Sequence, residues 1–149
     1  MELNDSVELV LQRKGSQVHT IAADATVYEA LQMLADRDIG ALVVMQESEL
    51  AGMFSERDYV RKVILKGRSS KEMRVGELMS SPAVTVTRHA TVDECMHLMT
   101  SKRFRHVPVV EAGSVIGVVS IGDLVNWIMS VQGQTIHQLE HYIAGGYPG

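Results

Sequence analysis

The amino-acid sequence predicts an α/β protein built from two β-α-β-β-α repeats, with short helices at both ends. A shift of 65 residues aligns 18–65 with 83–130 without a gap, and ten of the 48 aligned pairs are identical. The apolar residues also follow the same order in both copies, first with helical spacing and then in two strand-length runs. With 46% hydrophobic and 21% charged residues, 149 residues suffice for two small folded lobes.

Each repeat is expected to begin with a short strand and a capped helix. The strands are predicted at 18–21 and 84–86. Thr26 and Thr91 each precede a glutamate by three residues, which is the spacing of a capping box that starts a helix. Apolar residues then recur on one helix face at Val27, Ala30, Leu31 and Leu34, and at Val92, Cys95, Met96 and Met99.

A hairpin and a second helix are expected to complete each repeat. The apolar runs 41–45 and 50–54 flank a polar turn, and the runs 107–110 and 115–119 do the same in the second copy. A serine follows each hairpin directly and can cap a helix. The two serines are Ser55 and Ser120, and their helices are expected to end near Leu65 and Val131.

Three further segments lie outside the repeats. Asp5 with Glu8 predicts a capped N-terminal helix that closes at Gly15, 75–79 can form one or two helical turns, and 135–144 is predicted to be a last helix. The predicted organisation is an N-terminal helix and lead-in (1–17), a first repeat (18–66), a linker with a short helix (67–82), a second repeat (83–131) and a C-terminal helix and tail (132–149).

Composition and charge exclude several classes of protein. The net charge of −4 argues against a protein that binds nucleic acid through a large basic surface. No apolar run approaches the roughly 20 residues that span a bilayer. Cys95 is the single cysteine, which excludes a disulfide framework and a cysteine-rich zinc site and favours a cytoplasmic location. Its place on an apolar helix face predicts a small core residue and not a nucleophile.

A doubled motif, Gly-x-x-Ser-x-x-Asp, is the most informative feature for function. It occurs as Gly52, Ser55 and Asp58, and again as Gly117, Ser120 and Asp123. A glycine in a buried strand lets another backbone or a flat ligand approach closely. The serine stands beside free helix N–H groups that favour phosphate, and the aspartate can accept hydrogen bonds from a ribose diol. The same spacing is also an ordinary capping box, so a purely structural role stays open.

The doubled motif and the β-α-β-β-α order resemble the cystathionine-β-synthase (CBS) domain, which occurs in tandem pairs called Bateman modules. The resemblance covers about residues 18–131. It implies two repeats packed sheet to sheet around a pseudo-twofold axis, with two clefts between them. It also implies bound AMP, ADP, ATP or NAD(H), a homodimer and a regulated partner of unknown identity, with no metal, no catalytic cofactor and no catalysis of its own.

The resemblance also implies roles for residues of both repeats. Asp58 and Asp123 are expected to bind ribose hydroxyls. The phosphate contacts are expected to be Ser55, Ser120, Arg57, Arg105, His106 and Lys14. The cleft walls around adenine are expected to include His19, Ala41, Leu42, Val107, Pro108, Ile121 and Gly122.

The two clefts are not expected to be equal. By the resemblance, the segment before the second hairpin often supplies basic phosphate contacts, which implies that role for Arg105, whereas the aligned Gly40 carries no charge. The resemblance also implies that residues entering the first strand, Lys14, Ser16 and His19, can join Asp123. The cleft at Asp123 is therefore expected to take a charged mononucleotide. The basic run 56–62 lies near the other cleft, at Asp58. It is either a solvated surface or a binding site for a second phosphate or a dinucleotide.

Two other classes of function compete with a nucleotide sensor. One is a structural interaction module whose clefts are vestigial. The other is a zinc hydrolase, because His137, Glu140 and His141 satisfy the His-x-x-Glu-His metal motif. A third metal ligand and a substrate cleft are both missing from the expected architecture, which argues against the hydrolase.

Overall fold

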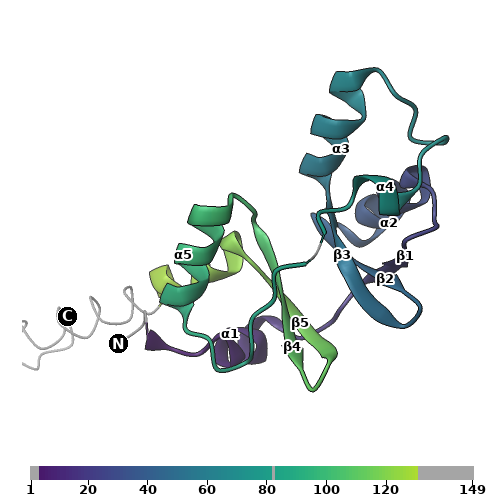
Figure 1. Ribbon diagram of the computed structural model, residues 1–149. Coiled ribbons are helices and arrows are strands. Elements are labelled where there is room, and N and C mark those ends of the chain that lie inside the picture. The colour runs from purple at the N-terminus through teal and green to yellow at the C-terminus, as the bar shows by residue number, and fades with distance from the viewer. Residues whose placement is uncertain (1–3, 82, 131–149) are drawn as a thin grey trace, which may run out of the picture.

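The computed structural model describes residues 4–81 and 83–130, which form two lobes (Figure 1). The linker predicted at 67–82, of which 67–81 are described, is the connector between the two repeats. The first lobe holds β1 (Thr20–Ala22), α2 (Val27–Arg37), β2 (Ala41–Gln46), β3 (Glu49–Ser55), α3 (Glu56–Lys62) and α4 (Val75–Leu78). The second lobe holds α1 (Val7–Lys14), α5 (Val92–Lys102), β4 (His106–Glu111), β5 (Ser114–Ser120) and a helix at 121–130. The predicted α/β fold with two repeats is confirmed.

The two sheets share one hairpin design and differ in the strand that precedes it. β1 pairs with β2 in parallel, and β2 pairs with β3 antiparallel. In the second repeat the strand expected at 84–86 is wrong, because only Val86 forms a parallel bridge, to Val109. Both hairpins shift register at equivalent places, after Val44 and after Val109, so the bulge is repeated along with the sequence.

Each lobe has its own hydrophobic core, and each core recruits a helix from outside its repeat. The first core joins Val27, Ala30, Leu34, Leu42, Val44 and Phe54 to Val75 and Leu78 of α4. The second core joins Val92, Cys95, Met99, Val107 and Val119 to Val7, Val10 and Leu11 of α1. The N-terminal helix therefore belongs to the second repeat, although it lies next to the first in sequence.

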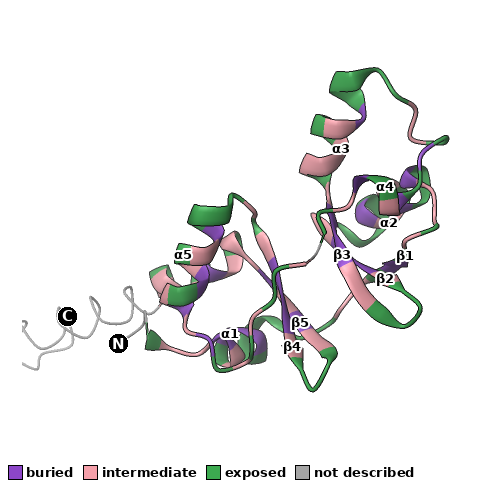
Figure 2. Ribbon diagram, viewed as in Figure 1, coloured by how far each residue is buried: buried purple, intermediate pink, exposed green. Residues whose placement is uncertain are grey.

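The sheets also bury residues on the face opposite each core. Val43 and Met53 pair across β2 and β3 and are buried, yet they belong to neither core. Pro108, which pairs with Val118 at the equivalent place in the other hairpin, is buried as well. Figure 2 shows buried stretches within the strands of both lobes. Each sheet therefore buries residues on both of its faces.

Most of the expected helix caps are confirmed, and one is wrong. Thr26 and Thr91 each accept a hydrogen bond from the backbone N–H three residues on, at 3.1 and 3.0 Å. Asp5 does not cap α1, because its Oδ2 accepts a 2.9 Å bond from the indole Nε1 of Trp127, and Ser6 takes the N-cap position. Asp5 therefore ties the start of α1 to the 121–130 helix.

The first repeat ends in a tighter turn than its sequence predicts. α3 stops at Lys62, and Ile64–Lys66 continue as a short 3-10 helix before Gly67, instead of one helix to about Leu65. Among the described residues, no helix is long and apolar enough to cross a membrane. The helix predicted at 135–144 lies outside the described residues.

Cys95 illustrates what burial does to a thiol in this fold. The residue is fully buried in the second core. Burial, assisted by the nearby Glu94 carboxylate, raises the pKa of its thiol to about 11. We expect no reaction of the folded protein with a disulfide reagent such as Ellman's reagent at pH 8, and complete reaction in urea. Rapid labelling without denaturant would contradict the observed packing.

Candidate functional site

Ser55 and Asp58 form a reciprocal hydrogen-bonded pair where β3 meets α3. The backbone N–H of Asp58 donates to Ser55 Oγ at 3.3 Å, and the backbone N–H of Ser55 donates to Asp58 Oδ2 at 2.9 Å. The Ser55 hydroxyl donates to the same Oδ2 at 3.1 Å. The capping-box explanation of the motif is confirmed, and it uses Oδ2 of the carboxylate.

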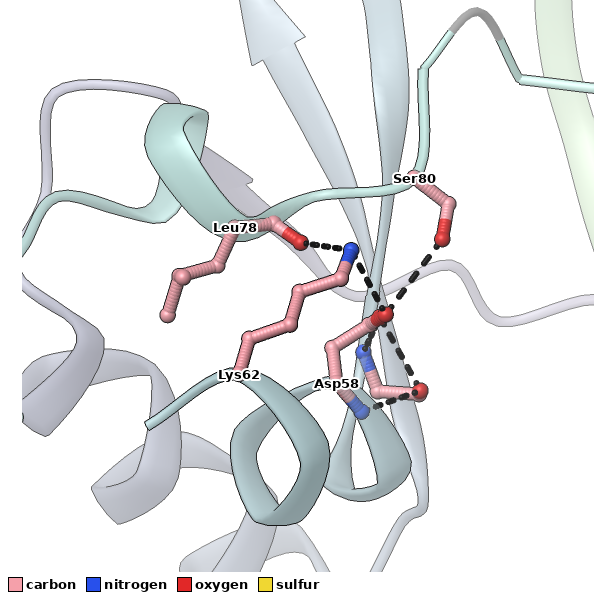
Figure 3. A network of polar contacts seen from close by, with 5 residues as sticks. Asp58, Lys62, Leu78 and Ser80 are labelled. Atoms are coloured by element: carbon pink, nitrogen blue, oxygen red, sulfur yellow. Dashed lines mark hydrogen bonds and ion pairs between the residues drawn. The ribbon is translucent and has the colours of Figure 1, made fainter. Parts of the chain in front are cut away.

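The other carboxylate oxygen of Asp58 belongs to a polar network (Figure 3). Lys62 Nζ lies 3.3 Å from Oδ1, and the Ser80 hydroxyl donates to Oδ1 at 3.4 Å. Lys62 Nζ also donates to the Leu78 carbonyl at 2.7 Å. Asp58 is therefore linked to the connector between the repeats, and both contacts of Oδ1 are longer than a typical hydrogen bond to a carboxylate.

Ser120 and Asp123 repeat this arrangement with a different cation. The backbone N–H of Ser120 donates to Asp123 Oδ2 at 2.8 Å, and that of Asp123 donates to Ser120 Oγ at 3.0 Å. Lys14 Nζ lies 2.6 Å from the same Oδ2 and also donates to the Val118 carbonyl at 2.8 Å. Lys14 therefore lies beside Asp123, as the resemblance implies, and pairs with its carboxylate, whereas its role as a phosphate contact stays a prediction.

Two clefts lie beside these aspartates. The Asp58 cleft is lined by 55–58 and 61–62 of the first repeat and by 102–106 of the second, and has a volume of about 550 Å³. The Asp123 cleft, lined by Lys14, His19, Asp38, Ser120 and Asp123 among others, has about 280 Å³. Gly40, Ala41 and His106 line both clefts, which places this shared wall where the two repeats meet.

Only two of the residues expected to frame adenine line a cleft. His19 and Ala41 line the Asp123 cleft, and Ala41 also lines the Asp58 cleft. Leu42 and Val107 are buried in the two cores, and Pro108 is buried on the opposite face of its sheet, so none of the three lines a cleft. Ile121 and Gly122 line neither cleft, and Ile121 packs on the second core.

The motif glycines are explained by packing. A methyl group added at Gly52 would lie 2.5 Å from the Ser80 carbonyl oxygen, because Met53 and Ser80 exchange backbone hydrogen bonds of 3.1 and 2.8 Å. At Gly117 the added methyl would meet the Leu11 side chain of α1 at 2.8 Å. Gly52 therefore lets another backbone approach closely, as predicted, whereas Gly117 makes room for a side chain.

The position of Arg105 differs from the expectation. Arg105 lines the Asp58 cleft and not the Asp123 cleft, so the larger and more basic cleft is the one at Asp58. Lys102 and Arg103 join Arg57 in that cleft, and neither was predicted from sequence. The signal that would have found them is the contrast between Arg103 and its aligned residue, Asp38.

His106 stands between the clefts in an electrically mixed environment. Burial lowers its pKa below the usual 6.5, partly opposed by the Asp123 carboxylate and reinforced by Lys14 and Arg105. A methyl group on Gly40 would lie 3.4 Å from its ring, so the imidazole fills the contact between the repeats. Burial therefore favours the neutral form of the His106 imidazole.

A lowered histidine pKa makes stability depend on pH. Between the lowered folded-state pKa and 6.5 the unfolded chain binds a proton that the folded chain does not. The contribution to stability is present above pH 6.5 and is lost as the pH falls through the folded-state pKa. We expect the melting temperature of the wild type to fall more on acidification from pH 7 to 5 than that of His106→Gln. Parallel curves would contradict this.

No group of three or more potential metal ligands occurs within the described residues. His137, Glu140 and His141, the motif of the hydrolase alternative, lie outside them. The hydrolase alternative therefore gains no support from the part of the chain that the structure describes.

Comparison with known proteins identifies the family. The CBS domain pattern matches residues 13–65 and 75–130. The mitochondrial CBS domain-containing protein CBSX3 of Arabidopsis thaliana is 43% identical over 129 residues, 83% of this chain and 63% of that protein. This chain thus spans less than two thirds of that relative.

Solved structures agree with this match. A CBS-domain protein from Burkholderia ambifaria is 41% identical with a TM-score of 0.81, covering 85% of this chain and 95% of that one. A hexameric CBS-CP12 protein from cyanobacteria is 28% identical with a TM-score of 0.74, covering 81% and 69%. With two matched repeats, two capped Ser-x-x-Asp turns and two clefts between them, the chain belongs to the CBS domain family.

Proposed function

We propose that this protein is a regulatory module that binds an adenosine-containing ligand between its two repeats and has no catalysis of its own. The observation that carries the proposal is the 550 Å³ Asp58 cleft, whose size suits a nucleotide. The ligand class is AMP, ADP, ATP or NAD(H). We place the primary site at Asp58 and a weaker or second site at Asp123.

The chemistry of the Asp58 cleft supports this ligand. Ala41, Met53, Val84 and Phe104 offer an apolar wall for adenine, with Phe104 half-buried and able to present its ring. Asp58 Oδ1 can accept ribose hydroxyls in place of its present partners. The surrounding guanidinium groups supply the donors that phosphate prefers.

The binding site is suited to regulation because both repeats and the connector contribute to it. A ligand that contacts both lobes stabilises one arrangement of the lobes relative to each other. A partner protein that binds this arrangement more tightly then responds to the presence of the ligand. We place the protein in the cytoplasm, whereas the Arabidopsis relative is named as mitochondrial.

A homodimer is part of the proposal. Val60, Val125 and Met129 are exposed apolar residues on the second helices of the two repeats, and Ile64 is exposed on the 3-10 helix that follows α3. Val63 and Ile128 pack on the cores. Exposed apolar residues of this kind are typical of interaction surfaces. The cyanobacterial CBS-CP12 structure is described as a hexamer, which shows that a related pair assembles.

Isothermal titration calorimetry with AMP, ATP and NADH tests the proposed function. We expect at least one ligand to bind with saturable heat, and the first binding event to be absent in Asp58→Ala. The competing structural module is favoured by the completed capping boxes, which explain both motifs without a ligand. Baseline heats with all three ligands would favour that module and overturn the sensor.

A further inference from the structure

Six basic side chains surround the Asp58 cleft, three from each repeat. The first repeat contributes Arg57, Arg61 and Lys62, and the second contributes Lys102, Arg103 and Arg105. Only two acidic residues, Glu56 and Asp58, share the cleft. This concentration of positive charge stands out in a chain whose net charge is −4.

The positive charge of this cleft is largely uncompensated. Lys62 pairs with Asp58 at 3.3 Å. Within the part of the chain that the structure describes, the other five basic residues form no ion pair with a carboxylate. Like charges from two lobes that face one cavity repel each other, so a bound polyanion relieves repulsion as well as gaining attraction.

The Asp123 cleft lacks this charge although it is built from the aligned residues. A shift of 65 residues places Gly122, Asn126 and Trp127 opposite the three basic residues of α3, and Arg37, Asp38 and Gly40 opposite the three of the second repeat. Five of the six positions are therefore not basic in the other copy, and one is acidic. Asp38 itself lines the Asp123 cleft. The charge is a property of one cleft and not of the fold.

We propose that the Asp58 cleft selects ligands by their number of phosphate groups and binds a nucleoside di- or triphosphate in preference to a monophosphate. This inference rests on the proposed adenosine function and adds the ligand class to it. A chain of two or three phosphates offers more charged oxygens to the cations on the two sides of the cleft than a single phosphate does. A nucleic acid is a poorer fit, because the charge lines a cavity between two lobes and does not form a continuous outer stripe.

Calorimetry with adenosine, AMP, ADP, ATP and inorganic tripolyphosphate, in EDTA at low salt, tests the inference. Each phosphate that gains a charge-assisted hydrogen bond is expected to tighten binding about tenfold or more. The ratio of the affinities for ATP and AMP is expected to decrease in 0.5 M salt, because salt screens exposed charges.

Arg103→Asp is a variant that the fold already tolerates. Arg103 and Asp38 are both left-handed, with φ of 59° and 53°, so aspartate occupies this conformation at the equivalent place. We expect Arg103→Asp to weaken the binding of ATP by about tenfold or more and to weaken the binding of AMP far less. Arg37→Asp is the matched control, because it changes the net charge equally and lines neither cleft. Equal losses in both variants would overturn the inference.

The panel separates the inference from the proposed function. If AMP binds as tightly as ATP, the preference for di- and triphosphates is overturned, but the proposed adenosine-binding function is not. If tripolyphosphate binds as tightly as ATP, the preference for several phosphates is supported, but the proposal that the ligand contains adenosine is overturned. Failure of every compound to bind overturns both.

Discussion

Asp58→Ala is expected to weaken binding of adenosine ligands by about 100-fold or more, because it removes the carboxylate that accepts the ribose hydroxyls. Two hydrogen bonds to a charged group contribute about 3 kcal/mol or more together. Calorimetry with the tightest ligand of the panel measures the loss. Asp58→Asn keeps an oxygen that can accept from the Ser55 N–H, and it is expected to bind weakly while folding normally.

Asp123→Ala is the matched control for this experiment. It removes the same capping interaction, since Asp123 Oδ2 accepts from Ser120 N–H at 2.8 Å as Asp58 Oδ2 does from Ser55 at 2.9 Å. Both alanine variants should therefore lose about 1 kcal/mol of stability. Only Asp58→Ala should lose the tight site. Equal loss of binding in the two variants would mean that the aspartates act through stability and not through ligand contacts.

Gly52→Ala is expected to reduce the free energy of unfolding by about 3 kcal/mol. The new methyl would lie 2.5 Å from the Ser80 carbonyl, a backbone atom held in place by its paired hydrogen bonds with Met53. The connector must move away from β3, which also displaces the Ser80 hydroxyl from Asp58. Urea denaturation gives the change in stability.

Gly117→Ala is the comparison for this prediction. Its methyl would meet side-chain atoms of Leu11 at 2.8 Å, and these can rotate where a backbone carbonyl cannot. We expect a smaller loss, of about 1 kcal/mol. A neutral Gly52→Ala, or a larger loss for Gly117→Ala, would contradict the role given to the connector.

Local features of the sequence predicted local structure well. The repeat, both hairpins, the threonine caps and the pairing of each motif serine with its aspartate are set by residues close together in the chain. Lys14 was also placed correctly beside Asp123, through the resemblance to the family.

Features that depend on distant contacts were predicted less well. Asp5 was expected to cap α1, but its carboxylate instead accepts a hydrogen bond from Trp127, which is more than a hundred residues away in the sequence. Arg105 was assigned to the Asp123 cleft because sequence does not reveal which side of the shared wall it faces. The strand at 84–86 shrinks to one bridge at Val86, although its residues favour a strand.

Photolabelling with 2-azido-ATP followed by peptide mapping tests most directly whether an adenosine ligand lies between the repeats. We expect the label in peptides that contain Ala41, Val84 or Phe104, with labelling suppressed by excess ATP and lost in Asp58→Ala. Labelling that excess ATP does not suppress, or that falls only on peptides outside both clefts, would contradict a nucleotide site in this protein.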